Sequence, residues 1–536
     1  MTASATTASA DSAIAGEEKK VIFASSLGTI FEWYDFYIYA TLAPFFATLF
    51  FPKGNATAAL LASFATYAAG FLVRPFGALV FGRIGDLVGR KYTFLVTILV
   101  MGLATAAVGF LPSYESIGML SPIILVLLRL AQGLALGGEY GGAATYVAEH
   151  APDGKRGLYT SWIQTTATLG FFVSLIVIGG CRGGMEEAAF KDWGWRIPFL
   201  LSLVLLAISV YIRMKLNESP VFLRMKAQGK GSKAPLRESF TKWPNLKLVL
   251  LALFGVTAGQ GVVWYTGQFY ALFFLTGTLK IDWKTSYLVL AVALALGTGF
   301  FIFFGWLSDR IGRMKIMMAG CALAALTYFP IYHAMGHYGN PALEAFAEKT
   351  KISLVADNCQ VHLFPNPKTV YSDCDKVQDF LSKRSLSYET TPGAAGSKTI
   401  VHLNDTTIEG FDEAKLTASL KSLGYPAKAN PDDINVGMLI LLVFIQVIYV
   451  TMVYGPIAAF LVELFPTRIR YTSMSLPYHI GNGWFGGMLP LTTAAVVAAS
   501  GNIYSGLWYP VIVAAISLVI GTLFVRDAKA HDFHAL

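Results

Sequence analysis

Charge is scarce in this chain of 536 residues. Asp, Glu, Lys and Arg make up 14% of it and apolar residues 55%, whereas a typical soluble domain has about 25% charged residues. These proportions exclude a soluble globular protein, a disordered chain and a nucleic-acid reader. Four cysteines are too few for a disulfide framework, and the HExxH and GxxxxGK[ST] motifs of zinc and phosphate chemistry are missing. The composition predicts an all-α membrane protein that is no enzyme and needs no metal or cofactor.

Twelve segments are apolar and long enough to span a bilayer, which takes about 20 residues. They are 21–51, 58–82, 92–111, 122–149, 158–180, 196–214, 246–277, 286–307, 315–335, 436–464, 471–499 and 506–526. The first segment is too long for the apolar region of a signal peptide, so we expect it to remain as a spanning helix.

Lysine and arginine gather in alternate connecting segments, most densely in 215–245. Because these residues favour the cytoplasmic side, the pattern predicts a bacterial inner-membrane protein with both termini in the cytoplasm. The expected organisation is a disordered tail 1–20, a six-helix half 21–214, a cytoplasmic loop 215–245, helices seven to nine in 246–335, an extracytoplasmic insert 336–435, helices ten to twelve in 436–526 and a tail 527–536.

Two motifs recur in the chain. Gly82, Asp86, Gly89 and Arg90 have counterparts 223 residues later, and Glu149 and Arg156 have counterparts 314 residues later. The increase in offset is close to the length of the polar segment 336–435. Two six-helix repeats with one inserted domain explain both offsets, and parallel repeats place a substrate site at their junction near the midplane.

The repeated motifs lie where helices turn on the inner face, so we interpret them as a latch that closes this face. Glycines allow close helix approach, and acidic and basic partners can pair across the two halves. The alternative is a simple positive-inside anchor. The candidate latch residues are Gly82, Asp86, Gly89, Arg90, Glu149, Arg156, Asp309, Gly312, Arg313, Glu463 and Arg470.

The loop sequence Gly82-Arg-Ile-Gly-Asp86-Leu-Val-Gly89-Arg90-Lys91 resembles a signature of the major facilitator superfamily. Leu125-x-x-x-Arg129-x-x-Gln132-Gly133 is similar to a motif of its proton-coupled members. The segments 31–37, 73–77, 137–141 and 218–222 resemble its metabolite:proton symporters, which include proline/betaine, 2-oxoglutarate, shikimate and citrate permeases. The resemblance implies a two-half fold and proton symport. It does not cover the insert.

Five ionisable residues fall inside predicted spans: Glu32, Asp35, Arg74, Arg129 and Glu139. Charges in hydrocarbon are costly and usually functional. Counting along each helix at 1.5 Å per residue places four of them near the centre and Arg129 toward the outer end. The alternative is that one or two of them form structural pairs, for example Arg74 with Asp35.

The corresponding positions of the C-terminal half carry no charge, so we expect the two halves to divide the work. Glu32, Asp35 and Glu139 are the candidate proton carriers, with no order among them, and the arginines suit a substrate carboxylate. Individually, the aromatic candidates are also compatible with simple packing. The substrate-binding candidates are Arg74, Arg129, Gln132, Tyr37, Gln164, Gln260, Trp264, Tyr265, Gln268, Tyr449, Tyr454 and Asn482.

The insert 336–435 is polar and predicts a small α+β domain. Residues 399–403 alternate as a strand does, and 375–386 and 412–423 are typical of amphipathic helices. Cys359 and Cys374 lie on the expected oxidising side, where a disulfide or two free thiols are both compatible with the sequence. The role of the insert is open.

The sequence as a whole predicts a monomeric, proton-coupled importer of a small organic acid or zwitterion that works by alternating access. Its partners are this substrate, H⁺ and the lipid bilayer, with no nucleic acid. One alternative is an uncoupled facilitator or sugar porter. Another, from a different class, is a transporter-like sensor that signals through the outer domain.

Overall fold

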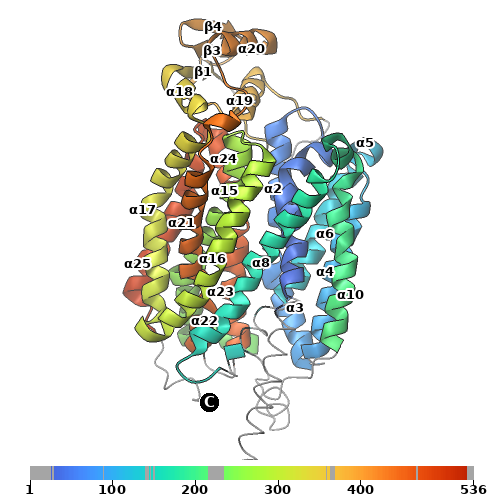
Figure 1. Ribbon diagram of the computed structural model, residues 1–536, viewed down its shortest axis with the longest axis vertical. Helices are drawn as coiled ribbons and strands as arrows, with labels where there is room; N and C mark the ends of the chain where they lie inside the picture. Colours follow the sequence, from blue (N-terminus) through green and yellow to red (C-terminus); the bar gives the residue numbers. More distant parts are fainter. Residues whose placement is uncertain are drawn as a thin grey trace, which may run out of the picture.

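The computed structural model describes residues 26, 29–87, 90–138, 140, 144, 147–148, 151–214, 235–357, 359–362, 368–465 and 469–527. Long helices run side by side along the vertical axis of Figure 1, and a small domain with strands stands beyond one end of them. We call residues 29–214 the N half, residues 243–339 with 436–524 the C half, and residues 340–435 the insert.

The N half begins with a helix over residues 29–49. Its other helices are α2 (Ala56–Leu72), α3 (Arg74–Leu87), α4 (Arg90–Phe110), α5 (Tyr114–Ile117), α6 (Leu120–Gly137), α8 (Arg156–Gly183), α9 (Glu187–Ala189), the π-helical η1 (Phe190–Gly194) and α10 (Arg196–Met214). A short helix α12 (Pro235–Thr241) precedes the C half.

The first span of the C half is interrupted by π-helical turns. It runs through α13 (Trp243–Ala252), η2 (Leu253–Thr257), α14 (Ala258–Tyr265), η3 (Thr266–Tyr270), α15 (Ala271–Phe273) and η4 (Phe274–Thr278). The remaining elements are α16 (Trp283–Ile311), α17 (Arg313–Gly339), α21 (Val436–Tyr454), α22 (Ile457–Leu464), α23 (Arg470–Ile480), η6 (Gly481–Gly486), α24 (Leu489–Ser500), η7 (Ser505–Leu507) and α25 (Trp508–Phe524). Such π turns are rare in proteins overall, and those that occur often lie at functional sites.

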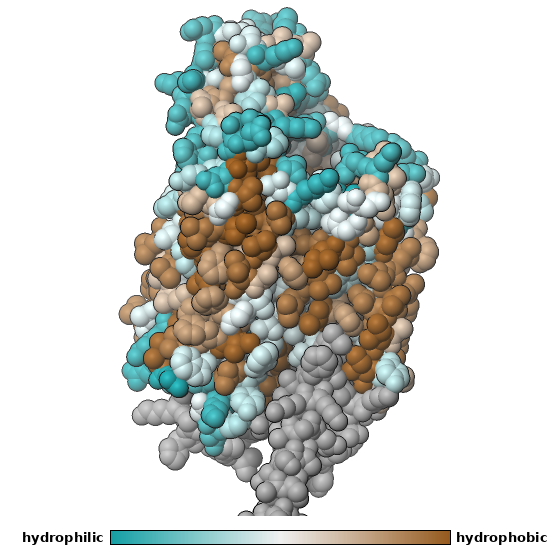
Figure 2. All heavy atoms as spheres, viewed as in Figure 1, coloured by the Kyte–Doolittle hydropathy of each residue, from teal (hydrophilic) through white to brown (hydrophobic). Residues whose placement is uncertain are grey.

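An apolar belt surrounds the bundle. Figure 2 shows hydrophobic residues over the middle of the helices and hydrophilic residues on the small domain and at the opposite edge. Within the described ranges, nine helices are long and apolar enough to cross a membrane, or ten if the bent pair Glu187–Gly194 and Arg196–Ile212 is one span. The belt and these helices define a multi-pass membrane protein.

The insert contains its own sheet and its own core. Its elements are α18 (Pro341–Lys349), β1 (Ile352–Ala356), α19 (Asp373–Lys383), β2 (Glu389–Pro392), β3 (Ile400–Leu403), β4 (Thr406–Glu409), α20 (Glu413–Ser422) and η5 (Pro431–Asp433). The strand order is β2-β1-β3-β4, parallel only between β1 and β2. Leu354, Val401, Leu403 and Leu416 are wholly buried between sheet and helices. Strand β3 and helices α19 and α20 lie where the sequence predicts them.

Candidate functional site

Two arginines from different helices converge on one aromatic ring in the N half. The guanidinium carbon of Arg74, at the start of α3, lies 4.4 Å from the centroid of the Phe36 ring. That of Arg129, from α6, lies 4.3 Å from the same centroid. Phe71 approaches Arg74 to 3.9 Å, and Tyr39 approaches Arg129 to 4.5 Å. The negative faces of these rings attract the guanidinium groups and hold both charges in an otherwise apolar environment.

These arginines keep unused hydrogen-bond donors although they are buried. Arg74 is 1% exposed and Arg129 is 0% exposed, and the Nε and Nη2 atoms of both have no hydrogen-bond partner. The ion pairs that the described residues form lie elsewhere, at the ends of the bundle and in the insert. Buried donors without partners are costly. They would be satisfied by a bound group that brings several acceptor oxygens.

Gln132 orients Arg129, as its place in the same motif suggests. Its Oε1 accepts a 2.5 Å hydrogen bond from Arg129 Nη1, and its Nε2 donates to Thr105 Oγ1 over 2.8 Å. Because this bond uses Nη1 only, the other edge of the guanidinium stays available. The depth estimate that set Arg129 apart from Arg74 is wrong. Counting residues along one helix ignores helix tilt and the length of the arginine side chain.

Asp35 points from the first helix toward α10. It is 6% exposed and accepts a 2.5 Å hydrogen bond from Ser202 Oγ. The structural pair of Arg74 with Asp35 is therefore not formed. Glu32 is buried as well, whereas Glu139 lies outside the described residues. A hydroxyl partner leaves the Asp35 charge uncompensated, and protonation would remove that charge.

The π-helical first span of the C half meets the arginine cluster through aromatic rings. Trp264 stacks on Tyr37 of the N half, with centroids 5.6 Å apart, and its Nε1 has no hydrogen-bond partner. Tyr265 meets Phe71 edge-on at 5.5 Å. Gln268 Nε2 donates to Thr168 of the N half over 3.3 Å. Four of the predicted binding residues, Tyr37, Trp264, Tyr265 and Gln268, thus lie at the junction of the halves.

Three other predicted residues are hydrogen-bonded to partners other than the arginines. Gln260 and Asn482 bond each other through both amides, each at 2.9 Å. Tyr449 accepts from Thr327 Oγ1 over 3.0 Å within the C half. These contacts leave the three side chains little freedom to bind a substrate.

A second contact between the halves involves a pair of stacked tyrosines. Tyr140 of the N half lies on Tyr478 of the C half, with centroids 3.6 Å apart and planes 2° apart. Gln164 Nε2 donates to Tyr140 Oη over 2.6 Å, and Tyr454 Oη is 2.8 Å from Tyr478 Oη. Gln164 and Tyr454, both predicted for substrate binding, therefore belong to one network that crosses the junction.

Sequence reasoning missed Tyr67 and Phe36. The ring of Tyr67 lies 5.2 Å from the Arg129 guanidinium, and its hydroxyl has no hydrogen-bond partner. A signal exists, because Tyr67, Phe71 and Arg74 follow the i, i+4, i+7 spacing of one helical face. Phe36 carries no signal beyond its place next to Asp35.

Several of the predicted latch residues connect the two halves at the start of α8. This helix has no side-chain cap of its own. Instead, Asp309 of α16 accepts hydrogen bonds from the backbone N–H groups of Gly157 and Leu158, each at 2.8 Å. A carboxylate at a helix N-terminus satisfies free donors and complements the helix dipole. Here the cap and the helix belong to different halves.

Arg313 completes this latch on the side of the C half. Its guanidinium pairs with Asp309 at 2.5 Å and with Glu463 at 2.9 Å, while Arg156 lies 4.0 Å from Glu463. Gly157 sits so close to α16 that an added Cβ would be 2.4 Å from the carbonyl oxygen of Gly305.

The other latch candidates are held locally or cannot be placed. Arg470 Nε donates to the Phe465 carbonyl over 3.1 Å. Gly312 ends α16 with φ of 104°, a conformation that favours glycine. The side chains of Gly82, Asp86, Gly89, Arg90 and Glu149 lie outside the described residues.

Known proteins resemble this chain along its length. The family described as sugar (and other) transporter matches residues 20–250. The inner membrane metabolite transport protein YhjE of Escherichia coli (strain K12) is 39% identical over 60% of this chain and 74% of its own. The alpha-ketoglutarate permease of the same strain is 36% identical over 62% and 77%. A putative metabolite transport protein of Haemophilus influenzae is 32% identical over 95% of this chain and 94% of its own.

Among solved structures, the proton:xylose symporter XylE bound to 6-bromo-6-deoxy-D-glucose has a TM-score of 0.63 at 15% identity, covering 96% of this chain and 98% of its own. That likeness and the helical bundle in two halves (Figure 1) define the major facilitator fold. The relatives named above are transport proteins. The chain belongs to the major facilitator superfamily, among its bacterial metabolite transport proteins.

Proposed function

We propose that this chain is a proton-coupled symporter that imports a small organic acid or zwitterion by alternating access. The observation that carries the proposal is the pair Arg74 and Arg129, both buried, with N–H groups that have no hydrogen-bond partner and with no ion pair to any carboxylate of the described residues. A substrate carboxylate would satisfy these donors with bidentate, charge-assisted hydrogen bonds. Tyr67 and Trp264 supply further free polar atoms beside it. The names of two relatives, an alpha-ketoglutarate permease and a proline/betaine transporter, support this substrate class.

Coupling to protons is assigned to the carboxylates of the first helix. Asp35 precedes Phe36, the ring on which both arginines lie, yet its own side chain turns toward Ser202. A proton site and an anion site therefore occupy neighbouring residues of one helix. Any movement of this helix on protonation would shift the ring beneath the arginines. Glu32 and Glu139 are the further candidates.

The topology we propose has twelve spans. The nine apolar helices, the bent pair, the shorter Leu95–Phe110 and residues 29–49 together reach this number. With both termini in the cytoplasm of a bacterial inner membrane, the insert lies outside and the latch at Asp309 lies inside. We expect the transporter to act as a monomer.

The test is uptake into proteoliposomes of labelled 2-oxoglutarate, proline and betaine, with and without an imposed pH gradient. One substrate should accumulate only when the outside is acidic. Among Glu32→Gln, Asp35→Asn and Glu139→Gln, at least one should lose accumulation yet keep exchange of labelled for unlabelled substrate. Full gradient-driven accumulation in all three variants would refute proton coupling through these residues.

The alternatives give different results in the same assay. Uptake that ignores the gradient indicates a facilitator, and preference for a sugar over every carboxylate and zwitterion indicates a sugar porter. Binding without flux indicates a sensor that signals through the insert.

A further inference from the structure

The insert is attached mainly to the C half. It is continuous with α17 and α21, and its Tyr388 N–H donates to the Gly501 carbonyl over 2.9 Å. Ser385 Oγ donates to the Gly277 carbonyl over 3.2 Å. In Figure 1 the insert stands above the helices of the C half. It should therefore move with the C half as one body.

One hydrogen bond ties the insert to the N half. Asp379 of α19 is 7% exposed, and its Oδ1 accepts from the backbone N–H of Thr57, in the first turn of α2, over 2.7 Å. The next N–H of that turn, from Ala58, is capped by Asn55 at 2.9 Å. The other carboxylate oxygen of Asp379 pairs with Lys383 at 2.9 Å. The start of α2 thus has a cap from its own half and another from the insert.

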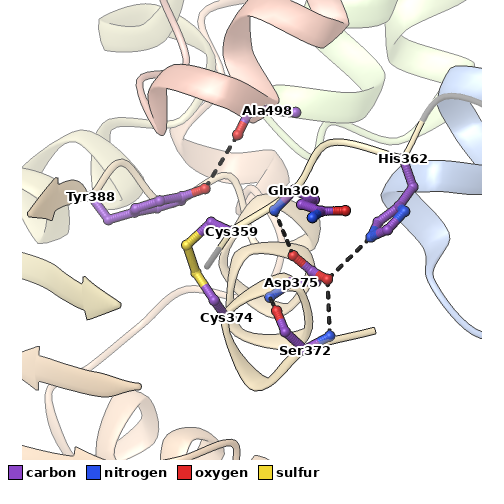
Figure 3. The surroundings of a disulfide bond; sticks show 8 residues. All are labelled: Cys359, Gln360, His362, Ser372, Cys374, Asp375, Tyr388 and Ala498. Carbon is purple, nitrogen blue, oxygen red and sulfur yellow. Dashed lines mark hydrogen bonds and ion pairs between the residues drawn. A yellow bond between two sulfur atoms is a disulfide. The ribbon is translucent and has the colours of Figure 1, made fainter. Parts of the chain in front are cut away.

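A braced loop stands beside this contact. The Cys359–Cys374 disulfide joins the loop to the start of α19. Asp375 adds hydrogen bonds from the Gln360 N–H at 2.8 Å and from His362 Nε2 at 3.1 Å (Figure 3). Together with Asp379, Gln360 and His362 line a crevice against the start of α2. The disulfide that the sequence left open is formed, and it fixes the helix that carries Asp379.

The same chemistry occurs at both ends of the junction between the halves. On the inner face, Asp309 of the C half caps the first turn of α8 in the N half. On the opposite face, Asp379, carried by the C half, caps the first turn of α2 in the N half. A transporter that opens alternately on either side has to break one such bond each time.

We propose that Asp379 is the latch of the outer face and the counterpart of Asp309 on the inner face. It releases the Thr57 N–H when the outer side opens and binds it again when that side closes. The insert is then a moving part of the transport cycle. This inference rests on the alternating access proposed above, and it assigns to the insert a role in timing rather than in substrate recognition.

The test measures outward opening directly. Phe64 of α2 is 4% exposed and lies 4.9 Å from Phe273 of the C half, so a cysteine at position 64 reports separation of the halves. With Cys181 and Cys321 replaced by serine, its reaction with a membrane-impermeant maleimide is followed from outside. Asp379→Ala should raise the rate by roughly fivefold, the equilibrium factor of one helix cap.

Thr57→Pro is the sharper variant. Proline removes the donated N–H together with the threonine side chain, is tolerated in the first turn of a helix and leaves Asp379 paired with Lys383. It should raise labelling as much as Asp379→Ala does, and the double variant should add nothing, because both changes remove one bond. Asp405→Ala, exposed on the same insert, is the control and should label at the parent rate.

Asp309→Ala separates this inference from the proposed function. It should lower labelling from outside, because it frees the inner face. Suppose that Asp309→Ala changes the labelling rate while Thr57→Pro and Asp379→Ala do not, or that the effects of these two multiply in the double variant. The outer latch is then refuted and alternating access stands. If none of the three responds, alternating access itself is refuted.

Discussion

Buried cations occur in two contrasting settings in this molecule. Arg74 and Arg129 lie on aromatic rings, and four of their nitrogen atoms have no partner. Arg313 of the inner latch pairs with Asp309 and Glu463. In the latch the fold itself compensates the charge, whereas in the centre it leaves the charge for something else to compensate. Under the proposed function, the paired arginine holds the inner face closed, and the two unpaired arginines bind the substrate.

The largest effect should come from removing a central cation. Arg129→Gln and Arg74→Gln should each lower uptake by about a thousandfold, within the range for losing one partner of a buried charge pair. Neither should lower the melting temperature, because none of the ion pairs among the described residues includes either arginine. Uptake and thermal unfolding in detergent check both halves of this expectation. A large loss of stability would mean that the arginines are structural.

In the latch, by contrast, a substitution should affect the stability of the folded protein more than it affects uptake. Glu463→Ala leaves Arg313 with one partner and should destabilise the folded protein by about 2 kcal/mol, less than for a deeply buried pair. Uptake should fall only by about tenfold, the equivalent of roughly 1.4 kcal/mol, because the substrate site is intact. The measurement is thermal unfolding alongside uptake. If Glu463→Ala and Arg129→Gln lose the same amount of stability and the same amount of uptake, the two settings do not differ in function.

Lys280 is a third case of a buried cation, and it lies outside the membrane-spanning helices. Burial and the neighbouring Arg384 lower its pKa to about 8. The folded state therefore disfavours the charged lysine. This penalty is fully present below about pH 8 and vanishes as the pH rises toward the ordinary value near 10.4.

Lys280→Met should accordingly raise stability by about 1–2 kcal/mol at neutral pH, since it deletes a desolvated charge. The gain over the parent should shrink between pH 8 and 10. Thermal unfolding across this range is the measurement. Lys284→Met, at an exposed position nearby, should change stability by less than about 0.5 kcal/mol throughout. A gain that is constant with pH would contradict the explanation by charge.

Much of the fold was accessible from the sequence because a bilayer imposes a simple rule. Spans must be long, apolar and helical, so the predicted segment 286–307 lies inside α16 (Trp283–Ile311) and 436–464 matches α21 with α22. The insert follows the ordinary rules of soluble domains, and its strand at 400–403 and helix at 413–422 are visible in the alternation of apolar residues.

The site was accessible only in part. Ionisable residues in apolar segments are conspicuous, which is why Arg74, Arg129 and Asp35 could be named. Phe36 and Ser202 could not be predicted as their partners, because they are ordinary residues in a membrane helix. Tyr67 had only the weak signal of its helical spacing with Arg74. The π turns of the span Trp243–Thr278 also change which side chains share a face of the helix. The periodicity of the sequence does not predict these turns.

Both carboxylates that connect the halves are bound by main-chain N–H groups, from Gly157, Leu158 and Thr57. Each carboxylate is thus bound by the first turn of a helix, through main-chain groups rather than through side chains. Side-chain substitutions in α8 or α2 that keep these N–H groups and the close approach at Gly157 leave the connection intact. Shifting either helix start by one residue would turn the receiving groups by about 100° around the axis. The length of the loop before each helix therefore matters more to this connection than the identity of most residues in the helix.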